Sequence, residues 1–217
     1  MTTQTSVQSA PQASKDSQTP PSWFRGFIQG KTRIVSAWLF AAAVVLSARH
    51  LPTLPGIIVC FLGATIRFWA SGYLRKDSRP AVGGPYAFVR NPLYLGTYLM
   101  AVGVTLAVEN YILLAALSVL YAVLYHYIIL DEETKLERIF GAPYITYKAV
   151  VPRFFPRVFP PLFPAKRADL VKVNPEPAHA KYDWALSNKN KAYEAYATFA
   201  ALIGFVAGVA LVWQRFV

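Results

Sequence analysis

The chain has 217 residues, of which 55% are hydrophobic and only 15% are charged, and its formal net charge is +11. Soluble domains carry about 25% charged residues, and the apolar surplus falls into blocks long enough to cross a bilayer. A membrane protein is therefore predicted. The positive charge is assigned to cytoplasmic loops rather than to nucleic-acid binding, and the single cysteine excludes a disulfide framework or a cysteine-based zinc site.

The first part of the chain is polar. Residues 1–22 are rich in Ser, Thr, Gln and Pro and are predicted to be a disordered tail, because they can bury almost no apolar surface. They are not expected to be a cleaved signal peptide, since they lack a basic start followed by an apolar stretch. The basic and aromatic segment from Trp23 to Arg33 suits the membrane surface, and residues 23–217 are predicted to form one membrane domain.

Five apolar spans follow, and each is predicted to be a helix because backbone polar groups in lipid must pair within their own segment. The spans are Ile34–Ala48, Ile57–Tyr73, Leu93–Val108, Tyr111–Leu130 and Ala195–Trp213. The first span is short, and Leu54-Pro55-Gly56 is interpreted as a turn before the second. Only Glu109 and Asn110 separate the third and fourth spans, which must therefore form a tight antiparallel hairpin.

Lys and Arg are distributed unevenly between the segments that flank these spans. Alternate segments carry 19 of them against 2 in the others, which predicts a cytoplasmic N-terminus and an outer C-terminus. The predicted fold is an all-α, polytopic helical bundle with about five transmembrane helices in the inner (cytoplasmic) membrane. Two long cytoplasmic segments result, Leu74–Pro92 and Asp131–Glu194, and any water-soluble ligand must be bound by them.

The first cytoplasmic segment carries a compact group of turn-forming and charged residues. Its sequence includes Gly83-Gly84-Pro85-Tyr86 and then Arg90-Asn91-Pro92-Leu93-Tyr94-Leu95-Gly96. The glycines and proline indicate a turn, and Pro92 suits the first turn of a helix. Free amide groups at this helix start, beside Arg90, can bind an anion, although an ordinary basic loop with a proline start explains the same residues.

The second cytoplasmic segment begins with three consecutive carboxylates, Asp131, Glu132 and Glu133. The fourth span is predicted to continue past the membrane as a helix that ends near Gly141. The carboxylates either form a solvated helical face or bind a cationic or hydroxyl-bearing ligand. The aromatic and basic stretch from Tyr144 to Pro156 suits, by itself, an anchor at the membrane interface.

In order and spacing, these motifs resemble the isoprenylcysteine carboxyl methyltransferases and the related phospholipid methyltransferases. The resemblance rests on Gly-Pro-Tyr, Arg-x-Pro-x-Tyr-x-Gly, a helical hairpin, Glu-Glu, Phe-Gly, Tyr-x-x-Tyr and Val-Pro-Arg, between Gly83 and Pro156. It covers about a third of the chain, and the first two spans and the last add little to it. These families are integral membrane enzymes that depend on S-adenosylmethionine.

The resemblance implies a site for S-adenosylmethionine at the cytoplasmic face. The positions that match the cofactor motifs are Tyr86, Arg90, Asn91, Pro92, Tyr94, Gly96, Glu132, Glu133 and Tyr144. Tyr147 and Arg153 occupy further recurrent positions, and Arg153 and Glu133 are the expected catalytic residues, with no metal. The family usually has His where this chain has Asn91, which can form hydrogen bonds but cannot become a cation.

The residue types suit methyl transfer. A cofactor carboxylate binds Arg or helix-start amides, its ammonium or ribose suits Glu, and an in-line displacement relies on positioning and exclusion of water. The hairpin is expected to bring Arg90 together with Glu132 and Glu133. The acceptor is expected to be an isoprenylcysteine-like carboxylate or a lipid headgroup that enters sideways from the bilayer. A carboxylate acceptor would need no general base, whereas an amine would have to lose a proton.

Several residues within the spans have structural explanations beside functional ones. The stem of Arg67 can snorkel toward the cytoplasm. A bond to a neighbouring helix explains His126 as well as contact with the acceptor does. Gly204 and Gly208 fit either a dimer face or close packing within one chain, so the oligomeric state stays open.

Two other functions compete with methyl transfer. Membrane reductases of the sterol reductase type resemble this family's cofactor-binding core, although the chain is short for their extra helices and shows no nicotinamide fingerprint. A non-catalytic membrane scaffold of the same fold is the other alternative. Titration with S-adenosylmethionine and with NADPH distinguishes the three functions.

Overall fold

The computed structural model of the protein describes residues 31–75, 80–156, 164–175 and 181–216. The predicted tail at residues 1–22, and residues 23–30 of the predicted interfacial segment, lie outside the described residues. Within the described part all regular structure is helical and there is no strand. The prediction of an all-α membrane helical bundle is therefore confirmed.

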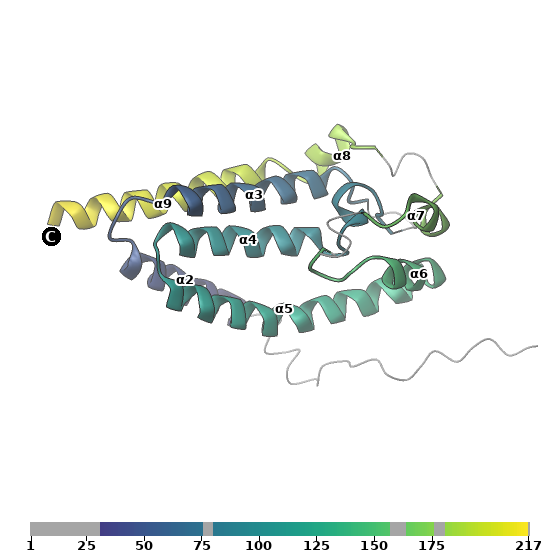
Figure 1. Cartoon of the computed structure of the whole chain (residues 1–217), viewed down its shortest axis with the longest axis horizontal. Coiled ribbons are helices and arrows are strands. Elements are labelled where there is room, and N and C mark those ends of the chain that lie inside the picture. The colour runs from purple at the N-terminus through teal and green to yellow at the C-terminus, as the bar shows by residue number, and fades with distance from the viewer. Residues whose placement is uncertain (1–30, 76–79, 157–163, 176–180, 217) are drawn as a thin grey trace, which may run out of the picture.

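Five apolar helices run along the long axis of the molecule (Figure 1). They are α2 (Lys31–Ser47), α3 (Leu54–Ser71), α4 (Pro92–Ala107), α5 (Tyr111–Phe140) and α9 (Glu194–Phe216). Each coincides with one predicted span. By length and composition α3, α5 and α9 can cross a membrane, whereas α4 and the Ala37–Ser47 part of α2 are apolar but shorter.

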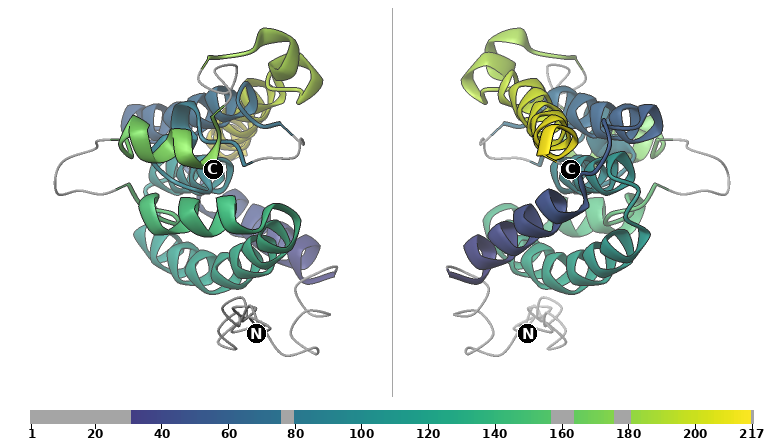
Figure 2. Two further views of the ribbon diagram at one scale, coloured as in Figure 1. Left: turned by 90° about the vertical axis from the view of Figure 1, so that its right-hand side faces the viewer. Right: turned by 90° about the vertical axis from the view of Figure 1, so that its left-hand side faces the viewer.

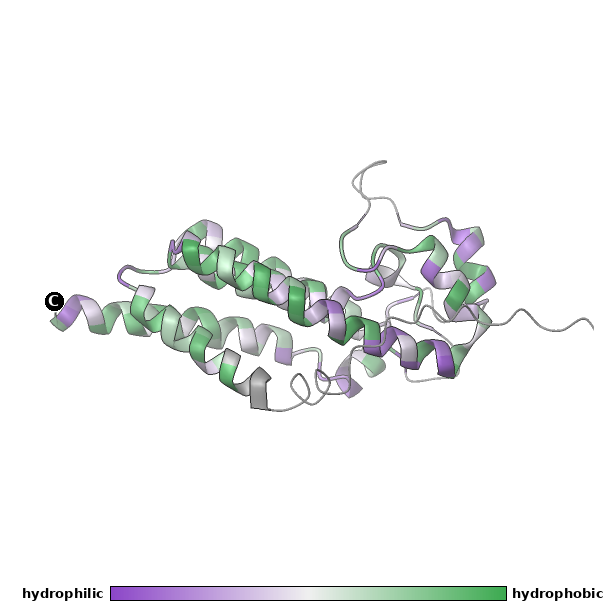
Figure 3. Cartoon of the chain, turned by 90° about the horizontal axis from the view of Figure 1, so that it is seen from below, coloured by the Kyte–Doolittle hydropathy of each residue, from purple (hydrophilic) through white to green (hydrophobic). Residues whose placement is uncertain are grey.

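The short elements gather at one end of the bundle, which is called the polar end below (Figures 1 and 2). They are the 3-10 helix η1 (Gly84–Ala87), α6 (Ala142–Val150), α7 (Arg167–Val173) and α8 (Trp184–Lys189). Figure 3 shows that the long helices are mainly hydrophobic along their length and that hydrophilic residues collect at this end. A binding site for a polar ligand is expected there.

The start of α3 differs from the prediction. The helix begins at Leu54, so the interpretation of Leu54-Pro55-Gly56 as a turn before the helix is wrong. Pro55 lies in the first turn, where a residue without an N–H group loses no helical hydrogen bond. Thr53 fixes this start to the end of α4, because its backbone N–H donates to the carbonyl of Ala107 at 3.1 Å.

The contact between α3 and α4 is the most extensive between any two described helices. A Cβ atom on Gly103 would lie 2.3 Å from the backbone nitrogen of Cys60, and one on Gly63 would lie 2.6 Å from the carbonyl oxygen of Gly96. The two backbones can approach this closely only because these positions have no side chain, which is typical of helix pairs in membranes.

The hairpin of α4 and α5 is confirmed. Glu109 turns the chain with φ of 52°, and the Asn110 side chain caps α5 by accepting the Leu113 N–H at 2.8 Å. As predicted, α5 continues to Phe140 and ends at Gly141, whose φ is 61°. The start of α4 and the last turns of α5 therefore lie together at the polar end (Figure 1).

Candidate functional site

A cavity of about 640 Å³ lies at the polar end, among α3, α4, α5, α6 and η1. This volume is in the range of small-molecule and cofactor sites. The predicted site residues that line it are Tyr86, Arg90, Asn91, Pro92, Tyr94, Glu132, Tyr144 and Tyr147. The chain thus brings eight of these predicted positions around one space, from segments that are far apart in the sequence.

Glu133 lies between two arginines and is 2% exposed. Its Oε1 is 3.3 Å from Nη1 of Arg90, and its Oε2 is 3.2 Å from Nη2 of Arg153. Arg153 also donates from Nε to Oε1 at 3.3 Å. One carboxylate and two guanidinium groups leave a net positive charge at a largely buried place, where charge is costly unless it is compensated. The group therefore favours an anionic ligand.

Arg90 has unused hydrogen-bonding capacity beside the cavity. Its side chain is 8% exposed, and its Nε and Nη1 have no hydrogen bond of good geometry. Buried polar groups in proteins are normally paired. These two atoms are buried, but the residue lines the cavity, so the guanidinium supplies positive charge to a ligand bound there.

Two hydrogen bonds hold the start of α4 against the segment that follows α6. The backbone N–H of Arg90 donates to the carbonyl of Pro152 at 2.9 Å. The side-chain amide of Asn91 donates to the carbonyl of Arg153 at 3.0 Å. This contact needs a donor and no charge, so an Asn serves it, and it places Arg153 beside Glu133.

Glu132 faces the cavity and is held by the α4 side of the hairpin. The Tyr94 hydroxyl donates to Oε2 of Glu132 at 2.8 Å, and the Tyr121 hydroxyl donates to the carbonyl of Tyr94 at 2.7 Å. Glu132 thus supplies a negative charge to the same cavity to which Arg90 supplies a positive one. This pairing suits a ligand that carries both an anionic and a cationic group.

Three buried tyrosines supply ring faces and a fixed hydroxyl. Burial raises the pKa of Tyr86 above its ordinary value, and Glu132 adds to the shift. Burial likewise raises the pKa of Tyr144, with Glu133 as the next contribution, and that of Tyr147. The Tyr147 hydroxyl donates to the carbonyl of Tyr86 at 2.7 Å. All three side chains stay neutral near pH 7, so they shape the cavity and do not act as bases.

Three predicted site residues do not line the large cavity. Glu133 and Arg153 lie behind it, as described above. Gly96 lies in the α3–α4 contact, where a Cβ would come within 2.6 Å of Cγ of Arg67. The lining also contains residues that the motifs do not indicate, among them Arg67, Arg75, Thr97, Tyr125, Leu136 and Ile139. For Arg67, the sequence feature that points to a site is a charged residue within an apolar span.

A smaller cavity of about 230 Å³ lies between α5 and the segment after α6. Its lining comprises Tyr98, Ser118, Tyr121, Ala122, Tyr125, His126, Ile129, Arg153, Phe154 and Phe155. Tyr125 lines both cavities. Ala122 and His126 are exposed on the outer side of α5, so the smaller cavity connects the apolar surface with the neighbourhood of the charged group.

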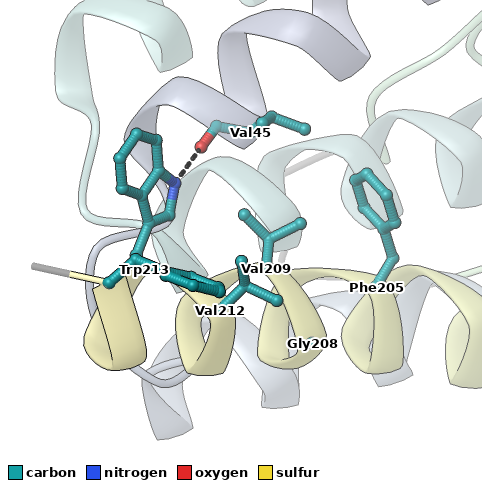
Figure 4. A pocket seen from close by; sticks show the side chains of 7 residues that line it. Val45, Phe205, Gly208, Val209, Val212 and Trp213 are labelled. Carbon is teal, nitrogen blue, oxygen red and sulfur yellow. Dashed lines mark hydrogen bonds between the residues drawn. The ribbon is translucent and has the colours of Figure 1, made fainter.

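A third cavity, drawn in Figure 4, lies away from the polar end between α2 and α9. Val45, Phe205, Gly208, Val209, Val212, Trp213 and Phe216 line it, and the Trp213 indole N–H donates to the carbonyl of Val45 at 3.1 Å. No ionisable side chain lines it. Apart from the surrounding backbone of α9 itself, no described atom lies within 4 Å of a Cβ placed on Gly204 or Gly208, so the described residues show no close packing against this pair.

Comparison with known proteins gives one family and two relatives. The model of the family described as phospholipid methyltransferase matches residues 38–143. The nickel-cobalt-cadmium resistance protein NccN of Alcaligenes xylosoxydans xylosoxydans is 29% identical over 131 residues, which are 59% of this chain and 57% of that protein. The cobalt-zinc-cadmium resistance protein CzcN of Cupriavidus metallidurans is 30% identical over 103 residues, or 46% and 47%.

The chain therefore spans about half the length of these curated relatives. No solved structure matches it. The matched family segment contains Arg90, Glu132 and Glu133 and ends just before Tyr144, so Arg153 lies beyond it.

Proposed function

Because residues 38–143 belong to the phospholipid methyltransferase family, we propose that this protein is a membrane methyltransferase that uses S-adenosylmethionine and a lipophilic acceptor. The family match confirms the resemblance predicted from the motifs. In this proposal the acceptor is an isoprenylcysteine-like carboxylate or a lipid headgroup. The protein is a multi-pass protein of the inner membrane, with its polar end in the cytoplasm, because the Lys and Arg bias places both motif segments there.

The single observation that most supports this cofactor is that the Arg90 guanidinium and the Glu132 carboxylate line the same cavity. A carboxylate is the group that a guanidinium binds best, and S-adenosylmethionine carries one. Its cationic ammonium and sulfonium groups suit the Glu132 carboxylate and the ring faces of Tyr86 and Tyr144 in the same cavity. When bound, this cofactor supplies an electrophilic methyl group on its sulfonium sulfur.

The chain's own residues orient the reactants and exclude water. Glu133 has a positioning role, because it holds Arg90 at the large cavity and Arg153 at the small one. A lipophilic acceptor enters the small cavity from the bilayer past Ala122 and His126, and it meets the large cavity at Tyr125. Arg153 is then placed to bind the acceptor beside the reacting atoms. Positioning of this kind is the main contribution available in a direct displacement.

The test is calorimetric titration of the purified protein in detergent with S-adenosylmethionine, followed by transfer of labelled methyl groups in membrane extracts. The wild type should bind the cofactor and label a product that partitions into organic solvent. Arg90→Ala should weaken binding about 10- to 150-fold, the range for hydrogen bonds to charged groups. Arg138→Ala, at an exposed position near the same end, is the matched control and should bind like the wild type.

Other outcomes identify the competing functions. Binding of NADPH without S-adenosylmethionine would indicate a reductase, and binding of neither would indicate a scaffold. Metal handling, which the names of the two relatives suggest, has less support in this chain. Among the residues that the structure describes, no group of three or more His, Cys, Asp or Glu side chains comes together.

A further inference from the structure

Arg67 is a guanidinium within an apolar helix that the proposed cofactor contacts do not use. It lies one turn before the end of α3 and lines the large cavity. An ionisable side chain inside a membrane span is costly and marks a functional site by default. The other arginines of this cavity are paired, Arg75 with Asp183 at 3.0 Å and Arg90 with Glu133 at 3.3 Å. Arg67 has no carboxylate within ion-pair distance in the part of the chain that the structure describes.

The α3–α4 contact makes room for this side chain. Gly56, Cys60 and Gly63 lie on the face of α3 that meets α4, and Arg67 is the next residue on that face at helical spacing. A Cβ on Gly96 would lie 2.6 Å from Cγ of Arg67. The absence of a side chain at Gly96 therefore lets the arginine cross α4 and reach the cavity.

Thr97 fixes the end of the arginine. Nη1 of Arg67 donates to the Thr97 hydroxyl, and that hydroxyl donates to the carbonyl of Leu93 at 3.0 Å. The hydroxyl proton is thereby committed to Leu93, so its oxygen faces the guanidinium. A guanidinium has five N–H donors, and this contact occupies one, which leaves others to bind a ligand in the cavity.

The two cationic centres of the cavity lie at different depths. Arg90 precedes α4, which begins at Pro92. Thr97 is in the second turn of α4, about 7.5 Å along the helix from Pro92 at 1.5 Å per residue. The cofactor carboxylate is assigned to Arg90 at the outer level. Arg67 at the inner level then requires a second anion, and the inner level lies among the apolar spans, where water-soluble anions are scarce.

We propose that Arg67 and Thr97 form a subsite for the anionic group, a phosphate or a carboxylate, of an amphiphile that comes from the bilayer. Tyr125 lines the large cavity beside them and also lines the small one, so the apolar part of the amphiphile can lie in the small cavity. This amphiphile is the methyl acceptor, an identification that rests on the proposed function. The subsite itself does not depend on methyl transfer.

The test measures binding of dodecyl phosphate to the full chain in an uncharged maltoside detergent, by calorimetry, with inorganic phosphate as the water-soluble comparison. The wild type should bind dodecyl phosphate at least 10-fold more tightly than Arg67→Gln does, the lower range for a charged hydrogen bond. Arg67→Lys should retain most of the affinity because it keeps the charge. Arg138→Gln, exposed at the same end, should bind like the wild type, and all variants should keep wild-type affinity for S-adenosylmethionine.

Each contrary result has one meaning. Equal affinity of the wild type and Arg67→Gln for dodecyl phosphate would overturn the subsite. Loss of S-adenosylmethionine binding in Arg67→Gln would assign the arginine to the cofactor instead. Tighter binding of inorganic phosphate than of dodecyl phosphate would overturn the bilayer source. If Arg67→Gln does not fold, Thr97→Val removes the orienting hydroxyl and serves in its place. A wild type that binds dodecyl phosphate but not S-adenosylmethionine would refute methyl transfer and leave the subsite standing.

Discussion

Glu132 and Glu133 are neighbours in the sequence but have different surroundings. Successive residues of a helix point about 100° apart, so one carboxylate of α5 faces the large cavity and the other faces the two arginines. Glu132 accepts a hydrogen bond from Tyr94 and can also reach a ligand. Glu133 is 2% exposed and is engaged with the protein. Glu132 is therefore the carboxylate available to a ligand, whereas Glu133 holds the two arginines in place.

These different surroundings predict that a Glu→Gln substitution lowers stability at one position and cofactor affinity at the other. Glu133→Gln leaves two guanidinium groups without their carboxylate and should lower the free energy of unfolding by about 3 kcal/mol, near the lower end for breaking a buried ion pair. Glu132→Gln should leave stability nearly unchanged and weaken S-adenosylmethionine binding about 10-fold or more. Thermal unfolding in detergent and calorimetric titration measure the two effects, and the reverse pattern would contradict these roles.

At the scale of elements, the contact of α3 with α4 depends on glycines, whereas the glycines of α9 face open space. A Cβ on Gly103 would lie 2.3 Å from the backbone nitrogen of Cys60, which cannot move without the whole helix. Around Gly204, no described atom outside the neighbouring backbone of α9 lies within 4 Å of such a Cβ. A Gly→Ala change at Gly103 therefore tests helix packing, whereas the same change at Gly204 tests helix propensity alone.

We expect Gly103→Ala to lower the free energy of unfolding by about 1–3 kcal/mol, the range for overpacking. Gly204→Ala should be neutral or slightly stabilising, because Ala favours a helix more than Gly does. Thermal unfolding of both variants in the same detergent measures the difference. Equal midpoints for the two variants would show that α3 and α4 do not pack this closely.

The sequence predicts elements better than it predicts their contacts. The two-residue connection at Glu109 and Asn110 was sufficient to predict the hairpin, and hence the approach of Arg90 to Glu133. The predicted start of α3 lies three residues after the observed one at Leu54. A proline is tolerated both in a turn and in the first turn of a helix, so the sequence does not distinguish the two. That Arg67 lines the cavity could not be predicted from the sequence. Its position depends on how α3 is aligned along α4, and residue spacing within one helix does not determine that alignment.

At the scale of the whole molecule, the polar end carries the candidate site, and the topology proposed from the charge bias puts this end in the cytoplasm. A reporter fused after Pro164, in the segment between α6 and α7, should read cytoplasmic. A reporter fused after Val217 should read the opposite side, because α9, which is long and apolar enough to cross a membrane, lies between the two fusion points. Two reporters on one side of the membrane would contradict the five-span arrangement.

The length of α5 ties the site to the physical state of the lipid. The helix has 30 residues, about 45 Å at 1.5 Å per residue, whereas the hydrocarbon core of a bilayer is about 30 Å thick. Its membrane part and its carboxylates belong to one continuous helix. A span adjusts to a thinner or thicker bilayer by tilting, and any tilt of α5 relative to α4 moves Glu132 relative to Arg90. The distance between Glu132 and Arg90 across the cavity is thus expected to depend on the thickness of the bilayer.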